Sequence, residues 1–279
     1  MSYVIVMDSC GERTEEMKKD SRIISAPLTM QVDEYAFVDD DTFDQLDFLQ
    51  KVADSPNCPT SACPAPDYYR QAFDCGVDRA YAVTLSAELS GSCNSAQLAK
   101  KLVLEDHPDM KIHVFNSRSA SIGETLITMK IQECEEAGME FEQVVETVEN
   151  YIQGKNTYFV LENLETLRKN GRLSNLKAFV ASALKIKPVM RGTQEGTIAQ
   201  LDQARGINKA LVKMVNYLVE EVEHPEEKVL AISHCNCPER GQMVANAILE
   251  RINVKDVVLV NASGVTTMYA NDGGIVAVI

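Results

Sequence analysis

Apolar runs of strand length alternate with stretches of helical spacing through the first half of the chain. Tyr3–Met7, Ala80–Leu85 and Lys111–Phe115 are short, apolar and partly β-branched, which is typical of buried strands. Alanine and leucine recur at helical spacing from Asn94 to Leu104, and an amphipathic pattern runs from Phe141 to Gln153. Strands that alternate with helices in this way indicate an α/β fold with a largely parallel sheet.

Weaker patterns fill the remainder of this half. They predict helices over residues 12–19, 42–53 and 67–75 and one ending near residue 137, an extended segment over 23–32 and a loop over 56–66.

Gly154-Lys155-Asn156 is the best candidate for a domain boundary. Beyond it the pattern predicts strands at 157–161, 229–233 and 257–260, a hairpin of 186–190 with 197–201, and helices at 164–169, 175–184, 207–222 and 239–252, and a terminal apolar run covers 275–279. We therefore divide the chain into an N-terminal α/β domain, residues 1–155, and a C-terminal α/β domain with a mixed sheet, residues 156–279.

Composition narrows the classes of partner. The net charge of −14 and the isoelectric point near 4.8 argue against nucleic acid, and against more than transient contact with an anionic membrane. No apolar run approaches the roughly 20 residues of a membrane-spanning helix. The segment from Tyr3 to Asp8 lacks the basic start of a signal peptide, so we expect a cytoplasmic protein.

The cysteines do not indicate a metal site. Cys235-Asn236-Cys237 lies beside His234, but the chain has no second closely spaced cysteine pair of the kind that structural zinc usually requires. We expect reduced thiols and no bound metal. His234, at the end of a predicted strand, is the one histidine placed like a site residue.

Two hydroxyl-rich turns carry the candidate chemistry. Ser90-Gly91-Ser92 follows the strand Ala80–Leu85, and the turn that contains Ser121 follows Lys111–Phe115. Carboxyl ends of parallel strands meet at one edge of a sheet, where ligands bind and helix N-termini attract anions. The alternative is that these serines only cap helices and that Gly91 only makes a tight turn.

Other familiar sites find no support in the sequence. No G-x-S-x-G segment accompanies the serines, so a hydrolase triad is not indicated. The glycine patterns of nucleotide-binding loops are also missing, so we expect no nucleotide cofactor.

Several segments together resemble the DegV family over essentially the whole chain and in the right order. They are Asp8-Ser9, Pro59-Thr60-Ser61, Leu85 to Ser92, Ser119 to Gly123, Leu164 to Ser174 and Lys185 to Pro188. The most specific are Leu89-Ser90-Gly91-Ser92 and Leu167 to Ser174.

The resemblance implies two α/β domains with a fatty acid buried between them. In bacterial fatty acid kinases, the DegV-like subunit presents this acid to a separate ATP-using subunit that makes an acyl phosphate. By motif, Thr60, Ser61 and Ser90 match the positions that hold the acyl carboxylate, and we add Gly91, Ser92 and Ser121 of the two turns as ligand-binding candidates.

The sequence departs from the family pattern in two places. The family's H-x-G-P-G loop is replaced by residues 268–273, so that Tyr269 stands where the histidine should be. Tyrosine can donate a hydrogen bond but carries no positive charge at neutral pH. In the Thr60 loop, Ala62-Cys63 replaces the usual glutamine-proline pair. Both changes concern the headgroup end of the expected site.

Arg172 lies in the most recognisable segment, between a predicted helix end and a serine that opens the next helix. Such a position is normally exposed, and with Arg168 and Lys169 it forms a local basic island in an acidic chain. We expect it to serve the partner kinase or an incoming phosphate.

The resemblance and the residues together favour a cytoplasmic fatty-acid carrier that delivers its lipid to a partner kinase. Two alternatives stay open: a serine-dependent acyl or phosphoryl transferase that uses Ser90, and a binder of another small carboxylate or phosphate. A base beside Ser90 would favour the transferase. An enclosed apolar tunnel would favour the fatty-acid carrier, and a shallow polar pocket would favour the binder of another small carboxylate or phosphate.

Overall fold

The N-terminal half is built on four parallel strands. A computed structural model describes residues 2–173 and 185–279 of the chain, so the predicted helix at 175–184 lies outside the described residues. The strand order is β2 (Ile23–Ala26), β1 (Tyr3–Asp8), β6 (Arg79–Thr84) and β7 (Lys111–Asn116), and every pair is parallel. The predicted parallel sheet is confirmed.

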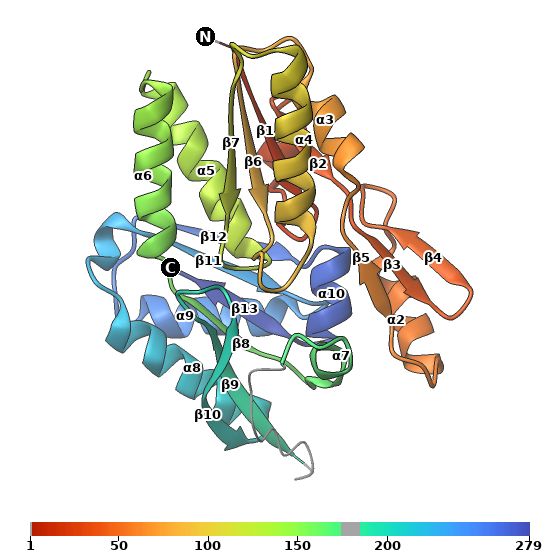
Figure 1. Cartoon of the computed structure of the whole chain (residues 1–279). Helices are drawn as coiled ribbons and strands as arrows, with labels where there is room; N and C mark the ends of the chain where they lie inside the picture. The colour runs from red at the N-terminus through yellow and green to blue at the C-terminus, as the bar shows by residue number, and fades with distance from the viewer. Residues whose placement is uncertain (1, 174–184) are drawn as a thin grey trace.

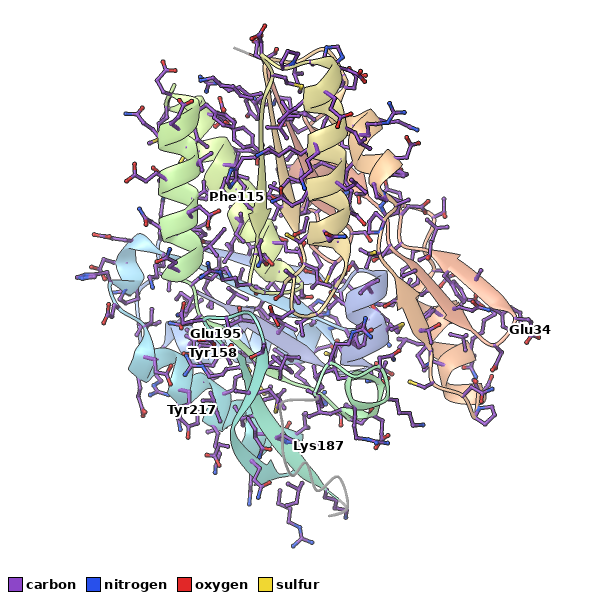
Figure 2. All side chains as sticks on the ribbon, viewed as in Figure 1. Glu34, Phe115, Tyr158, Lys187, Glu195 and Tyr217 are labelled. Carbon is purple, nitrogen blue, oxygen red and sulfur yellow. The ribbon has the colours of Figure 1, made fainter. Side chains whose placement is uncertain are left out.

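Alternation along β1 explains why helices cover both faces of this sheet. Val4 and Val6 pack under α3 (Pro66–Phe73) and α4 (Ser92–Asp106), whereas Ile5 and Met7 point to the opposite face, under α5 (Ile122–Glu136) and α6 (Phe141–Gln153). Successive side chains of a strand point to opposite faces, so a strand buried on both faces is continuously apolar. Phe115 of β7, labelled in Figure 2, lies in the core beneath α5 and α6.

The C-terminal half is built on a mixed sheet of six strands. Their order is β10 (Ile198–Arg205), β9 (Ile186–Gly192), β8 (Thr157–Val160), β13 (Ile275–Val278), β11 (Val229–His234) and β12 (Asp256–Asn261). Only the β11–β12 pair is parallel; the other pairs are antiparallel. The predicted mixed sheet is thus also confirmed.

The two faces of this mixed sheet meet different neighbours. One face packs on α8 (Ile207–Glu221) and α9 (Pro238–Leu249), where Tyr158 and Val189 are buried. The other face meets α5 and α7 (Glu165–Lys169), so that it points toward the N-terminal half, as Figure 1 shows. No described strand before residue 155 pairs with one after it, although the division into domains at this point stays a prediction.

A small antiparallel sheet extends from the side of the N-terminal half. Its order is β4 (Tyr35–Val38), β3 (Thr29–Val32) and β5 (Thr60–Ala62), and α2 (Gln45–Asp54) packs beside it (Figure 1). β5 lies in the segment that we predicted as a loop, and β4 and α10 (Gly264–Ala270) were not predicted. The remaining elements are α1 (Glu15–Lys19) and a short 3-10 helix, Pro225–Glu227.

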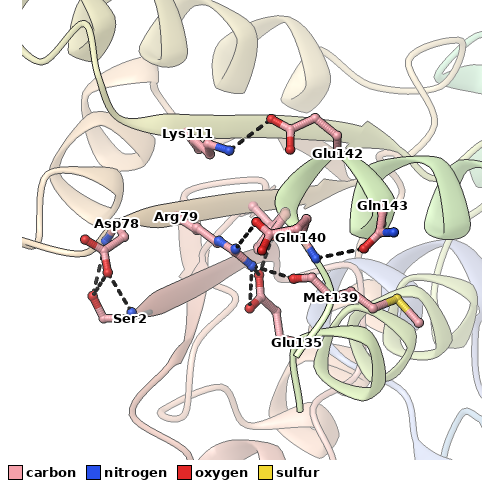
Figure 3. A network of polar contacts seen from close by, with 10 residues as sticks. Ser2, Asp78, Arg79, Lys111, Glu135, Met139, Glu140, Glu142 and Gln143 are labelled. Atoms are coloured by element: carbon pink, nitrogen blue, oxygen red, sulfur yellow. Dashed lines mark hydrogen bonds and ion pairs between the residues drawn. The ribbon is translucent and has the colours of Figure 1, made fainter. Parts of the chain in front are cut away.

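A buried ion pair joins the start of β6 to the last turn of α5 (Figure 3). Arg79 lies 3.1 Å from Glu135 and donates to the carbonyl of Met139 at 2.9 Å, and Tyr81 also donates to Glu135. Side chains of both ions are almost fully buried. This network holds the amino-terminal edge of the parallel sheet, the edge opposite to the hydroxyl-rich turns.

Candidate functional site

A cavity of about 340 Å³ lies between the two halves, at the carboxyl edge of the parallel sheet. Both halves contribute to its largely apolar wall. The N-terminal half provides Leu28, Leu85 and Leu89, and the C-terminal half provides Phe159, Leu161 and Leu167, together with residues of α10. The cavity therefore lies where the turns after β6 and β7 face the mixed sheet.

Ser61 and Tyr269 meet at the wall of this cavity. β5 carries Ser61 and α10 carries Tyr269, and their hydroxyl oxygens are 3.2 Å apart. Burial raises the pKa of Tyr269, so its hydroxyl keeps its proton at neutral pH and can donate to an anion. The short strand β5 and the helix α10, both missed from the sequence, are what bring these two hydroxyls together.

The two serine hydroxyls of the Ser90-Gly91-Ser92 turn lie in different surroundings, one at the cavity and one in the core. Ser90 lines the cavity, and its Oγ accepts from the Ser92 N–H at 3.2 Å. Ser92 is fully buried at the start of α4, with its Oγ 3.1 Å from that of Ser90, and it does not line the cavity. Gly91 does line it; a Cβ there would lie 2.9 Å from the Cys63 sulfur, so that a side chain would displace Cys63.

Arg172 faces the cavity and is half-buried. Its Nε donates to the Leu89 carbonyl at 3.1 Å, and its guanidinium carbon lies 5.9 Å from the centre of the Tyr269 ring. It makes no ion pair with any described carboxylate, and residues 174–184 contain no acidic residue. Arg168, by contrast, pairs with Glu165 at 2.8 Å. The expected exposed island is wrong for Arg172, which lies beside the hydroxyls instead.

Ser61, Ser90, Arg172 and Tyr269 are called the polar cluster below. Two other sequence candidates lie differently. Thr60 is exposed and is not among the residues that line the cavity. Ser121 lines it, but its hydroxyl donates to Glu12 at 2.8 Å, so this hydroxyl already has a partner.

Four buried carboxyls, Asp8, Glu12, Asp39 and Glu124, lie behind the cavity wall and were missed as functional candidates. Asp8 accepts from the Leu85 N–H at 2.8 Å and from the Cys10 N–H at 3.1 Å. Burial and the neighbouring Asp8 raise the pKa of Glu124 well above its usual range. The only sequence signal was the position of Asp8, directly at the carboxyl end of β1.

Glu12 and Asp39 connect the two halves. Glu12 accepts from Ser121 at 2.8 Å and from Ser233 of β11 at 3.0 Å, and burial raises its pKa to about 7. Asp39 accepts from the Gly264 and Val265 N–H groups at 2.7 and 2.9 Å, and burial raises its pKa to about 6. Asp39 thereby satisfies free amides in the first turn of α10, the helix that carries Tyr269.

The described residues provide no set of ligands for a metal ion. They contain no group of three or more His, Cys, Asp and Glu side chains with suitable placement, and the cysteines in this part of the chain are free. His234 is buried, which lowers its pKa, and it does not line the cavity. Among the helices described, none is long and apolar enough to cross a membrane.

Comparison with known proteins gives the family. The sequence profile described as "Uncharacterised protein, DegV family" matches residues 2–279. The chain belongs to the DegV family. A DegV domain-containing protein of Streptococcus pneumoniae is 36% identical over 277 residues, which are 99% of this chain and 98% of the relative. The resemblance seen in the sequence is confirmed.

Two solved DegV-family structures are similar over the full length. One, from Ruminococcus gnavus and refined with vaccenic acid, is 52% identical, with a TM-score of 0.97 and coverage of 100% of this chain and 99% of that one. The other is the fatty acid kinase (Fak) B3 protein of Streptococcus pneumoniae loaded with linoleic acid; it is 33% identical, with a TM-score of 0.89 and the same coverage. Both proteins hold fatty acids.

Proposed function

We propose that this DegV-family protein binds a long-chain fatty acid in the cavity and carries it to a partner kinase. The carboxylate lies at the polar cluster, and the tail extends along the apolar wall. The observation that carries this proposal is the position of Arg172, a cation without a described acidic partner, beside the Ser61 and Tyr269 hydroxyls at an apolar cavity. The fatty acids held by the two similar structures support it.

The chemistry of the cluster suits a carboxylate. Hydroxyl groups and a guanidinium donate hydrogen bonds, and bonds to an ionised acceptor are roughly twice as strong as neutral ones. The tail contributes about 0.8 kcal/mol for each CH₂ that leaves water. Gross binding energy on the order of ten kcal/mol for a long chain would keep the lipid bound through purification.

Delivery of the bound fatty acid to a kinase is the more specific part of the proposal. It is supported by the similarity to the Fak B3 protein, whose name places it with a fatty acid kinase. Arg172 has the charge and the position to contact a phosphoryl group when the carboxylate is converted to an acyl phosphate. No cofactor is needed in this chain for that role.

A serine-dependent transferase is the weaker alternative. The hydroxyl next to Ser90 belongs to Ser92, and no histidine lines the cavity among the described residues. A nucleophilic serine requires an adjacent base. The surroundings of Ser90 therefore favour a hydrogen-bond donor to the ligand over a nucleophile.

Mass spectrometry of lipid extracted from the denatured protein tests the carrier function. We expect a long-chain acid in the wild type and a loss of roughly 1–3 kcal/mol in affinity for each of Ser61→Ala and Ser90→Ala, because each removes a hydrogen bond to a charged group. Thr60→Ala, next to Ser61 but exposed, is the matched control and should bind as wild type.

Two outcomes would contradict the proposal. Extraction of small polar metabolites alone, without exchange of added fatty acid, would exclude the carrier. Wild-type affinity in the Ser61→Ala/Ser90→Ala double variant would mean that the carboxylate lies elsewhere. For the kinase step, Arg172→Ala should slow acyl-phosphate formation with a fatty acid kinase more than it reduces bound lipid.

A further inference from the structure

Three glycines line the cavity, and local structure explains two of them. Gly91 touches Cys63, as described above. Gly196 has a φ of +89°, which L side chains rarely adopt, and a Cβ there would collide with the Ser86 hydroxyl. Gly91 and Gly196 are therefore glycines because the chain has no room or no suitable conformation for a side chain.

Gly192 differs, since its surroundings would accept a side chain. The nearest heavy atom to a Cβ on Gly192 is the Thr157 Cβ at 3.4 Å, and the Arg118 carbonyl and the Thr157 hydroxyl follow at 3.9 Å. Its φ is not in the left-handed region. Glycine also weakens a strand relative to residues with side chains. Neither backbone conformation nor close packing requires glycine at this position.

A side chain at position 192 would point into the cavity. Gly192 follows Met190 by two residues on β9, so both lie on the same face of the strand. Met190 packs with Phe159, Ile198 and Val276, all of which belong to the face that meets the N-terminal half, and these three line the cavity. Val189 packs on the opposite face, beneath α8.

Gly192 lies away from the polar cluster. Its neighbours Arg118 and Thr157 share no described contact with Ser61, Tyr269 or the other members of that cluster. In the view of Figure 1 the β9–β10 turn, marked by Glu195 in Figure 2, lies to the left of α7 and α10. The Ser86 hydroxyl donates to the Gly196 carbonyl at 2.7 Å, which fixes this turn against the N-terminal half.

We propose that Gly192 sets the length of the acyl chain that the cavity accepts. The inference rests on the proposed function and specifies the ligand of the same site. Because the carboxylate is held at the polar cluster, the last carbons of the tail occupy the space that a side chain at position 192 would fill. Each methylene that no longer fits costs about fourfold in affinity, the change that corresponds to about 0.8 kcal/mol.

Competition among saturated acids of increasing length, read by mass spectrometry of the extracted lipid, tests this inference. Gly192→Val should shift the bound acids toward shorter chains, about fourfold in preference for each methylene excluded. Gly192→Ala should shift them less. Ala199→Val adds the same kind of volume to the neighbouring strand at a residue that does not line the cavity, so its profile should match the wild type.

A compensating substitution sharpens the result. Gly192 pairs with Ile198 across the β9–β10 ladder, and both line the cavity. Ile198→Ala in the Gly192→Val background should restore the longer acids by returning the lost volume.

An unchanged profile in folded Gly192→Val would overturn the inference. If that variant does not fold, Ile198→Val alone should admit longer acids, and an unchanged profile there is equally decisive. A wild type that carries no fatty acid would instead overturn the proposed function.

Discussion

The polar cluster and the buried carboxyls lie on two sides of the same cavity wall, but they differ in how their hydrogen bonds are used. Glu12 accepts from Ser121 and from Ser233 of the opposite half, Asp39 accepts from helix amides of the opposite half, and both carboxyls are buried. Tyr269 and Arg172 are only partly buried: the Tyr269 hydroxyl contacts that of Ser61, and Arg172 donates to the carbonyls of Leu89 and Asn170 while its other N–H groups have no described partner. Buried polar groups that are satisfied contribute to the structure, whereas donors left free toward a cavity are available to a ligand.

This difference predicts that substitutions behind the wall change folding and that substitutions in the polar cluster change binding. The largest effect is expected for Asp39→Ala, which leaves the Gly264 and Val265 amides without their acceptor. We expect a loss of about 3 kcal/mol in the free energy of unfolding, measured by denaturant titration, because buried amides without a partner are costly. The amount of bound lipid should decrease together with the stability, since α10 carries Tyr269.

Asp39→Asn is the control for this prediction. The amide keeps one acceptor oxygen, so the variant should retain part of the lost stability. A fully stable Asp39→Ala protein would mean that α10 does not need this cap, and the contrast between the two groups would then fail.

A smaller effect is expected from Glu12→Gln, and it should depend on pH. The pKa of Glu12 is raised to about 7, so the folded state favours the protonated carboxyl. The stability that the protonated Glu12 carboxyl contributes is complete below the pKa of Glu12 in the unfolded chain, near 4.3. It is lost as the pH rises through the folded-state pKa of about 7. Glutamine cannot ionise, so the variant should gain on the order of 2.5 kcal/mol relative to wild type between pH 5 and pH 8. Melting curves at several pH values would show it, and identical slopes for the two proteins would contradict the assignment.

The smallest effect concerns Tyr269→Phe, in the polar cluster. Removal of one hydroxyl donor should weaken fatty-acid binding by about 1 kcal/mol and leave the melting temperature of the lipid-free protein near wild type. Introducing the family residue with Tyr269→His should make affinity fall as the pH rises through about 6.5, where the imidazolium is lost. A drop in thermal stability without weaker binding in Tyr269→Phe would place this hydroxyl among the structural groups.

The sequence pattern was sufficient for the long elements but not for the short ones. α6 was predicted over its observed range, Phe141–Gln153, because its apolar residues repeat over several turns. β5 has three residues, Thr60–Ala62, and no apolar alternation, so its pairing with β3 cannot be read locally. α10 begins at Gly264, and the acceptor for its first amides is Asp39, far away in the sequence.

The same reasoning explains which site residues were recognised. Ser90 was found because a hydroxyl-rich turn follows a predicted strand, and Ser61 because its segment resembles a DegV-family motif. Glu12 was assigned to a polar helix, yet it is buried against Ser233, more than two hundred residues away. Arg172 was expected to be exposed, since a short segment between two helices usually is. Charge alone does not reveal burial, because the groups that satisfy a buried charge come from distant parts of the chain.

The position of β13 bears on how the protein is made. Residues 275–278 come after all other strands of the mixed sheet in sequence, yet they form its interior, between β8 and β11. During synthesis β8 and β11 have no ladder connecting them until these residues have left the ribosome, and pairings between residues so far apart in sequence form slowly. The cavity wall formed by Phe159 and Val276 is then completed late. A nascent chain exposes this apolar surface until β13 has inserted between β8 and β11. The risk of aggregation is therefore greatest before that insertion.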